Sequence, residues 1–201
     1  QGLGYAVVVT SLPALKQRQG VDDTVVTLIV LGVAIAAAGG SVLANALAVR
    51  FGSRTALVVG LLLQAAALPA IALPTPFPLF VSLFAVYGIG LGCVDAATAM
   101  QGVIVQRAHG KPLLGGFFSA YTAAAIAGAL LVSAIAASPF AAGVAIGTAG
   151  VAILVVAVVG IRLFAREVPI ETALPATERA RLPRAGIWAF GFVILAVFVV
   201  D

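Results

Sequence analysis

The stretch that decides the fold is Thr24–Val49, which reads TVVTLIVLGVAIAAAGGSVLANALAV and contains no charged residue. A helix that crosses about 30 Å of hydrocarbon needs about 20 predominantly apolar residues, so this stretch is long enough to cross a membrane once. Lipid offers no hydrogen-bonding partner to the backbone. A run of this length must therefore satisfy its N–H and C=O groups internally, which predicts a helix.

Two longer uncharged runs, Thr55–Val94 and Pro112–Ile161, are each about twice as long as one span needs. The first is interrupted by Pro74-Thr75-Pro76-Phe77-Pro78 and the second by Ser138-Pro139. Because proline cannot continue a helix, these interruptions predict two spans in each run. The four spans are expected near residues 55–73, 79–105, 113–137 and 141–165.

Mainly apolar residues also lie near both ends of the chain, at Gly2–Leu15 and from Ala185 to Val200. No basic region precedes Gly2–Leu15, as it would in a signal peptide. We therefore expect an all-α membrane protein that is part of a longer chain. Residues 1–165 would form six transmembrane helices, the first of them truncated, residues 166–184 a central cytoplasmic loop, and residues 185–201 the start of a seventh helix.

The composition excludes several classes of protein. Hydrophobic residues make up 63% of the chain and charged residues only 9%, whereas soluble domains carry about 25% charged residues. The net charge of +4 is too small and scattered to indicate a nucleic-acid partner. One cysteine, Cys93, and one histidine, His109, offer no metal site, bound cofactor or catalytic constellation, so no enzyme activity is expected.

The basic residues between the predicted spans are distributed unevenly. The connections after the second, fourth and sixth spans hold nine of them, and those after the first, third and fifth hold two. Because basic residues accumulate in cytoplasmic connections, this asymmetry places the even connections and the N-terminal side in the cytoplasm. The nine are Arg50, Arg54, Arg107, Lys111, Arg162, Arg166, Arg179, Arg181 and Arg184, and the two are Lys16 and Arg18.

The segment Leu47-Ala48-Val49-Arg50-Phe51-Gly52-Ser53-Arg54-Thr55-Ala56-Leu57 resembles the cytoplasmic loop signature of the major facilitator superfamily, Gly-x-Leu-Ala-Asp-Arg-x-Gly-Arg-Arg/Lys-x-x-Leu. The resemblance implies half of a major facilitator fold in a bacterial inner membrane, with the C-terminal half missing from this chain. It also implies that Arg50, Gly52 and Arg54 form a cytoplasmic gating loop. The matching positions are Leu47, Ala48, Arg50, Gly52, Arg54 and Leu57, and the departures are Asn45, Val49 and Ser53.

Two further segments are similar to the YbjJ-like and MosC-like branch of that superfamily. Residues 12–18 resemble its Arg-Ile-Pro-Ala-Ile-Lys-Glu-Arg, and residues 95–118 resemble its Asp-Val-Ala-Met-Asn-Ala-Gln-Gly and Gly-Arg-Pro-Ile-Met-Ser-Ser-Phe-His. The branch's polar Arg, Asn and His are replaced here by Ser11, Ala99 and Phe118. The superfamily's fifth-span antiporter signature has no counterpart in residues 121–137, which disfavours drug–proton antiport of the usual kind. The matching positions are Asp95, Ala97, Gln101, Gly102, Gly110, Pro112 and Phe117.

Asp95 is the most informative single residue, because a carboxylate at membrane depth is costly and usually faces a bundle interior or a water-filled cavity. It shares a helix face with small residues, including Gly88, Gly92 and Thr98, so we expect this face to look inward. Its role would be substrate contact or proton carriage, and the alternative is a structural carboxylate bonding a neighbouring helix. The glycine pairs Gly88/Gly92 and Gly143/Gly147 are expected to let neighbouring helices approach closely.

Other polar residues within the spans are candidate contacts of a solute or proton path. Asp201 in the seventh span is the second acidic candidate, and Tyr5, Tyr87 and Gln101 are uncharged candidates. Each of these three is alternatively an ordinary interhelical hydrogen-bonding group. His109 is expected in a solvated loop, and Phe117 and Phe118 are expected to pack against lipid or helices.

These features predict a secondary transporter that moves a small organic solute by alternating access between two halves, with solute bound midway. No nucleotide-binding motif occurs in the sequence, so a solute or ion gradient is expected to drive transport. Asp95 and Asp201 are the carboxylates expected within the spans, which makes proton symport the first interpretation. The alternatives are efflux of a drug-like or amphipathic metabolite and a membrane receptor or assembly protein that does not transport. The expected partners are the lipid bilayer, the solute and protons.

Overall fold

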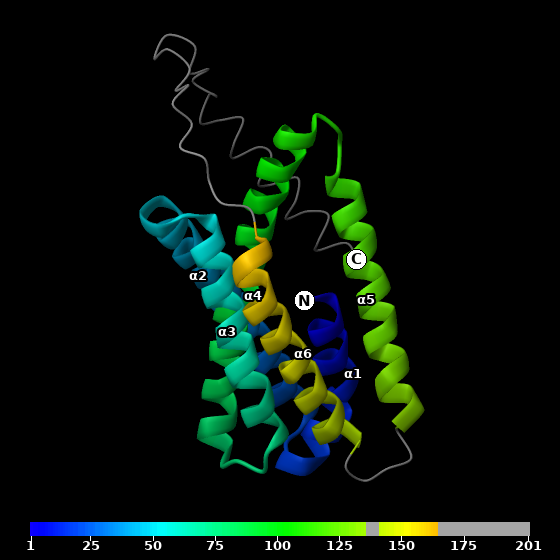
Figure 1. Cartoon of the computed structure of the whole chain (residues 1–201). Coiled ribbons are helices and arrows are strands. Elements are labelled where there is room, and N and C mark those ends of the chain that lie inside the picture. Colours follow the sequence, from blue (N-terminus) through cyan, green and yellow to red (C-terminus); the bar gives the residue numbers. More distant parts are fainter. Residues whose placement is uncertain (136–140, 165–201) are drawn as a thin grey trace. The chain divides into compact units, whose positions relative to one another are not determined.

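The computed structural model describes residues 1–135 and 141–164 as a bundle of α-helices (Figure 1). Five of these helices are long and apolar enough to cross a membrane, and α1 is not among them. The predicted central loop, the start of the seventh helix and the break at Ser138-Pro139 lie outside the described residues. The helices are α1 (Gly2–Gln19), α2 (Asp23–Phe51), α3 (Ser53–Ala72), α4 (Phe77–His109), α5 (Leu114–Ile135) and α6 (Ala141–Leu163).

The helices extend further than the apolar runs predict. Lys16 and Arg18 lie in the last turn of α1, and Arg107 and His109 lie in the last turn of α4. The expectation of a loop position for His109 is therefore wrong. Cations are favourable beside the unpaired carbonyls of a helix C-terminus, so these turns continue beyond the apolar segment. The proline cluster does separate α3 from α4, which begins at Phe77.

A single residue, Gly52, separates α2 from α3. Its φ of 89° is strained for any residue with a side chain, and its N–H donates a 2.9 Å hydrogen bond to the carbonyl of Ala48. The hydroxyl of Thr55 donates to the carbonyl of Phe51 across the same junction. The glycine of the loop signature therefore allows two helices to meet without a flexible connection.

The helices pack as two corresponding triplets. α4 packs mainly against α2 and α3, α1 packs mainly against α5 and α6, and α3 packs against α6. If α1, α2 and α3 are taken to correspond to α4, α5 and α6, the contacts of the two triplets match. The α2–α4 contact corresponds to the α1–α5 contact, and the α3–α4 contact corresponds to the α1–α6 contact. Successive triplets of spans enter the membrane from opposite sides, so this is the packing expected of inverted three-helix repeats.

Two glycines of α4 allow this helix to pack closely against α2. A Cβ on Gly88 of α4 would lie 2.7 Å from the carbonyl oxygen of Val33 in α2, and one on Gly92 would overlap the carbonyl of Ala37. The predicted close approach at this pair is therefore confirmed. The prediction is wrong for Gly147, because no neighbouring helix in the described part of the chain lies within 4 Å of a Cβ built there. Spacing places two glycines on one face but does not say whether a neighbour covers both.

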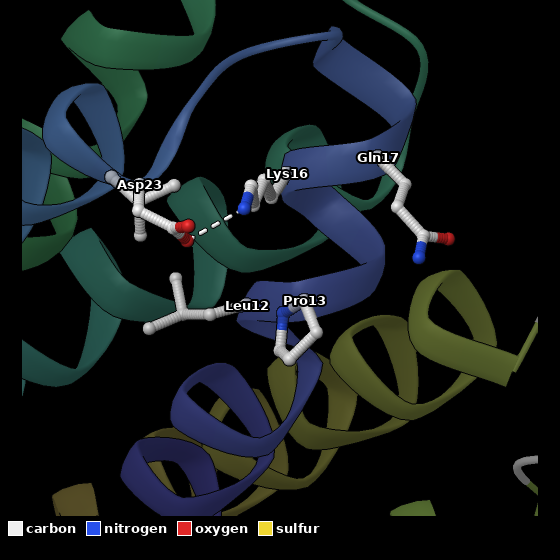
Figure 2. Close-up of a pocket in the computed structure, with 6 residues that line it drawn as sticks. Leu12, Pro13, Lys16, Gln17 and Asp23 are labelled. Atoms are coloured by element: carbon white, nitrogen blue, oxygen red, sulfur yellow. Dashed lines mark hydrogen bonds and ion pairs between the residues drawn. The ribbon is translucent and has the colours of Figure 1, made fainter.

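The α1–α2 connection carries an acidic pair at the start of α2. The Asp22 carboxylate accepts a 2.8 Å hydrogen bond from the N–H of Val25, which caps the helix. Figure 2 shows Lys16 of α1 and Asp23 pointing toward one another in a pocket that they line together with Leu12. Lys16 Nζ and Asp23 Oδ1 lie 2.6 Å apart. The Asp23 side chain is exposed, so this ion pair orients the connection more than it stabilises it.

Candidate functional site

Asp95 lies in the middle of α4 with its carboxylate directed toward the first turn of α1. The side-chain amide of Gln1 donates a 2.5 Å hydrogen bond to Asp95 Oδ1. The sequence predicts an inward-facing, buried carboxylate, but in the described bundle this side chain is exposed. Its carboxylate lines a cavity together with residues of α1, α3, α5 and α6.

A cavity of about 600 Å³ opens beside Asp95. Residues of α1, α3, α4, α5 and α6 contribute to its wall, so most of the bundle shapes it. Four side chains with hydrogen-bonding groups line it, namely Gln1, Asp95, Thr98 and Tyr121, and the remaining lining residues are apolar or glycine. Among the described residues that line this cavity, none is basic. Its volume is in the range of ligand sites in proteins, roughly 300–1,000 Å³.

Tyr87 and Tyr121 lie near this carboxylate, and Tyr5 lies near both of these tyrosines. Tyr87 of α4 lies within electrostatic range of Tyr5, Tyr121 and Asp95, and Tyr121 lies within range of Tyr5 and Asp95. Tyr5 and Tyr87 are candidates that the sequence predicts. Sequence reasoning missed Tyr121 of α5, and the only signal for it is a polar aromatic residue in an otherwise small and apolar span.

Buried polar groups without a protein partner lie in the same bundle. Tyr87 is only 2% exposed, and its hydroxyl has no hydrogen-bonding partner among the described residues. The amide of Gln64 in α3 is fully buried and likewise unpartnered within the described part of the chain. A polar group buried without a partner is costly, so these two side chains mark positions where water or a polar ligand would be stabilised.

Gln101 lies apart from this cluster. It is buried, and its side-chain amide donates a 2.7 Å hydrogen bond to the hydroxyl of Ser53, the first residue of α3. The structure therefore joins Gln101 to the α2–α3 junction, and Gln101 is not among the residues that line the cavity. This contact corresponds to the interhelical alternative that the sequence leaves open.

The predicted gating loop occupies the junction of α2 and α3. The guanidinium of Arg50 lies 5.8 Å from the ring centroid of Phe51, and Arg54 lies in the first turn of α3. Val49, at the position of the signature's Asp, is 83% exposed. Asp201 lies outside the described residues, so the structure does not bring it to the site. Among the residues that are described, no group of three His, Cys, Asp or Glu side chains is placed to hold a metal ion.

Comparison with known proteins agrees with this helical architecture. The family model of the Major Facilitator Superfamily matches residues 1–200. An uncharacterized MFS-type transporter of Yersinia pestis is 30% identical over 135 residues, which is 67% of this chain and 35% of the relative. The match thus spans about a third of that relative's length, and no solved structure is significantly similar. The family match over nearly the whole length, together with the paired helix triplets, shows that the chain belongs to the Major Facilitator Superfamily.

Proposed function

We propose that this chain forms the N-terminal half of a secondary transporter that moves a small organic solute by alternating access. The observation that carries the proposal is a carboxylate at membrane depth, Asp95, beside a cavity large enough for a solute. In this proposal the two inverted three-helix repeats form one of the two halves that rock against each other during transport. The α2–α3 junction at Gly52 is a short cytoplasmic connection within that half. We further propose a bacterial inner membrane with the N-terminal side in the cytoplasm.

Proton coupling through Asp95 is the second part of the proposal. A carboxyl group binds a proton where the cavity is dry and releases it where water enters, so its protonation follows the alternation of the two halves. The neighbouring amide of Gln1 and hydroxyl of Tyr121 are groups that would orient the carboxylate in either form. Symport is the first form of this coupling, with Asp201 as a second acid.

The Asp95→Asn variant tests this role because the amide keeps the shape of the carboxyl but cannot exchange a proton. The complete protein is reconstituted into liposomes with a trapped pH indicator, and proton movement is recorded while a panel of solutes is added. The wild-type protein is expected to couple one solute to proton movement. Asp95→Asn is expected to lose this coupling.

The matched control is Asp23→Asn, which makes the same chemical change at an exposed carboxylate outside the cavity. It is expected to transport like the wild-type protein. Full proton-driven accumulation by Asp95→Asn would contradict the coupling role. Loss of solute binding itself would instead identify Asp95 as a solute ligand.

The alternative function is efflux of an amphipathic metabolite. The observation that favours it is the apolar and aromatic wall of the cavity, which would suit an amphipathic solute. A receptor or assembly protein that does not transport is a weaker candidate, because it has no need of a carboxylate beside a cavity. Membership of the YbjJ-like and MosC-like branch is proposed on the sequence matches around Asp95 alone.

A further inference from the structure

We infer that the cavity beside Asp95 binds an amphipathic organic cation, such as a protonated amine that carries an apolar or aromatic body. The inference rests on the proposed function, since it names the class of solute that the proposed transporter would carry. It depends on three properties of the described cavity wall, which are its charge, its aromatic rings and its few hydrogen-bonding groups.

The charge of the wall is the first property. Among the described residues that line the cavity, Asp95 has the only carboxylate side chain, and none has a basic side chain. A cation placed there gains a charge-assisted hydrogen bond at a carboxylate that already accepts one from the neutral side-chain amide of Gln1. An anion in the same place would meet a like charge, and no basic side chain of the described wall would compensate it.

The aromatic side chains are the second property. Phe117, Phe118 and Tyr121 of α5 and Phe164 after α6 line the cavity together with Asp95. Three of these side chains, Phe117, Phe118 and Tyr121, are exposed on the bundle, by 41%, 71% and 38% of their surface. The face of an aromatic ring attracts a cation, and this attraction strengthens when water is excluded. A carboxylate with aromatic rings beside it is therefore suited to an organic cation.

The scarcity of polar groups is the third property. Besides Asp95, the described wall offers only the amide of Gln1, the hydroxyl of Thr98 and the phenol of Tyr121. A sugar or polyol carries many hydroxyls, and each hydroxyl that loses water without a partner weakens binding. A solute with one charged head and an apolar body leaves few such groups unpaired.

The test uses the complete protein purified in detergent and three probes that differ only in their head group. These are 2-phenylethylammonium, 2-phenylethanol and 3-phenylpropionate. Binding of the radiolabelled amine is measured by scintillation proximity, with the alcohol and the acid as competitors. The amine is expected to bind, and neither competitor is expected to displace it at equal concentration.

Substitutions then locate the binding site. Asp95→Asn is expected to weaken amine binding at least tenfold, whereas Asp95→Glu and the control Asp23→Asn retain it. Tyr121→Leu is expected to weaken binding a few-fold and Tyr121→Phe, which keeps the ring, is not. Thermal unfolding of each variant shows that it is folded, so a loss of binding is attributed to the site.

The proposal is overturned if the amine does not bind, if Asp95→Asn binds it as well as the wild-type protein, or if the acid binds more tightly than the amine. These outcomes are separable from failure of the proposed function. Proton-driven transport of another solute without amine binding would reject the cation class and leave the transporter standing. Amine binding that depends on Asp95, without transport of any solute, would establish the cation site and reject transport.

Discussion

The guanidinium of Arg18, in the last turn of α1, donates a 2.7 Å hydrogen bond to the carbonyl oxygen of Ala72, the last residue of α3. A second hydrogen bond of 2.6 Å joins the same guanidinium to the carbonyl of Ile71, and its carbon lies 5.9 Å from the ring centroid of Phe80. The last carbonyls of a helix lack partners within the helix and carry its negative dipole end. Arg18 therefore closes α3 and ties α1 to the start of α4.

Replacement of Arg18 by methionine, which keeps an apolar stem but no donors, is expected to lower the free energy of unfolding by about 1.5–3 kcal/mol. Arg18→Lys should recover part of this loss, because one ammonium does not reproduce the planar fork that reaches two carbonyls. Unfolding in detergent is followed by circular dichroism. Lys16→Met is the matched control, and its effect should stay within about 1 kcal/mol because its partner Asp23 is exposed. Equal effects at both positions would contradict the role of Arg18.

A methyl group at Gly92 is expected to destabilise the bundle. A Cβ there overlaps the carbonyl of Ala37 in α2, so Gly92→Ala should force α2 and α4 apart, at a cost of about 1–3 kcal/mol. Gly147→Ala makes the same change where no neighbouring helix among the described residues lies within 4 Å of the new Cβ, and its stability should be unchanged or slightly raised. Thermal unfolding of the two variants side by side checks the difference. A neutral Gly92→Ala would mean that the α2–α4 crossing is wider than the structure shows.

The contact between Gln101 and Ser53 is expected to contribute to stability and not to solute choice. A double-mutant cycle with Gln101→Leu and Ser53→Ala should give a coupling free energy of about 0.5–1.5 kcal/mol, as for a hydrogen bond between neutral groups. Solute selectivity of the folded variants should match the wild-type protein. A changed selectivity would return Gln101 to the candidate site residues, and a coupling of zero would mean that the contact is not formed.

The orientation in the membrane is tested with single cysteines in a Cys93→Ala background. Lys111→Cys, just after α4, should react with an impermeant thiol reagent only after the cells are opened. Pro74→Cys, between α3 and α4, should react in intact cells, and both positions are exposed. Ser53 is unsuitable as a labelling site because it is only 1% exposed. Reaction of Lys111→Cys in intact cells would reverse the proposed orientation.

The candidate site could be predicted in part. Asp95 is identifiable from sequence because the cost of a carboxylate in lipid makes it exceptional wherever the helices pack. Tyr121 could not be identified in this way, because its position near Asp95 depends on how α5 lies relative to α1 and α4. Gln101 was predicted as a candidate contact, but the neighbouring end of α3 gives it a partner at Ser53.

The number of the described helices was determined by the sequence itself. Length, hydropathy and proline are local properties, and lipid enforces internal hydrogen bonding on any long apolar run. The turn at Gly52 between α2 and α3 is also predictable from the sequence, because a positive φ is a local property that glycine adopts without strain. Only the tertiary structure decided which glycines contact a neighbouring helix and which tyrosines lie near Asp95. It also decided that Arg18 binds the last carbonyls of α3. Those outcomes depend on contacts between residues far apart in the chain, and the spacing of residues along one helix does not specify which neighbour faces them.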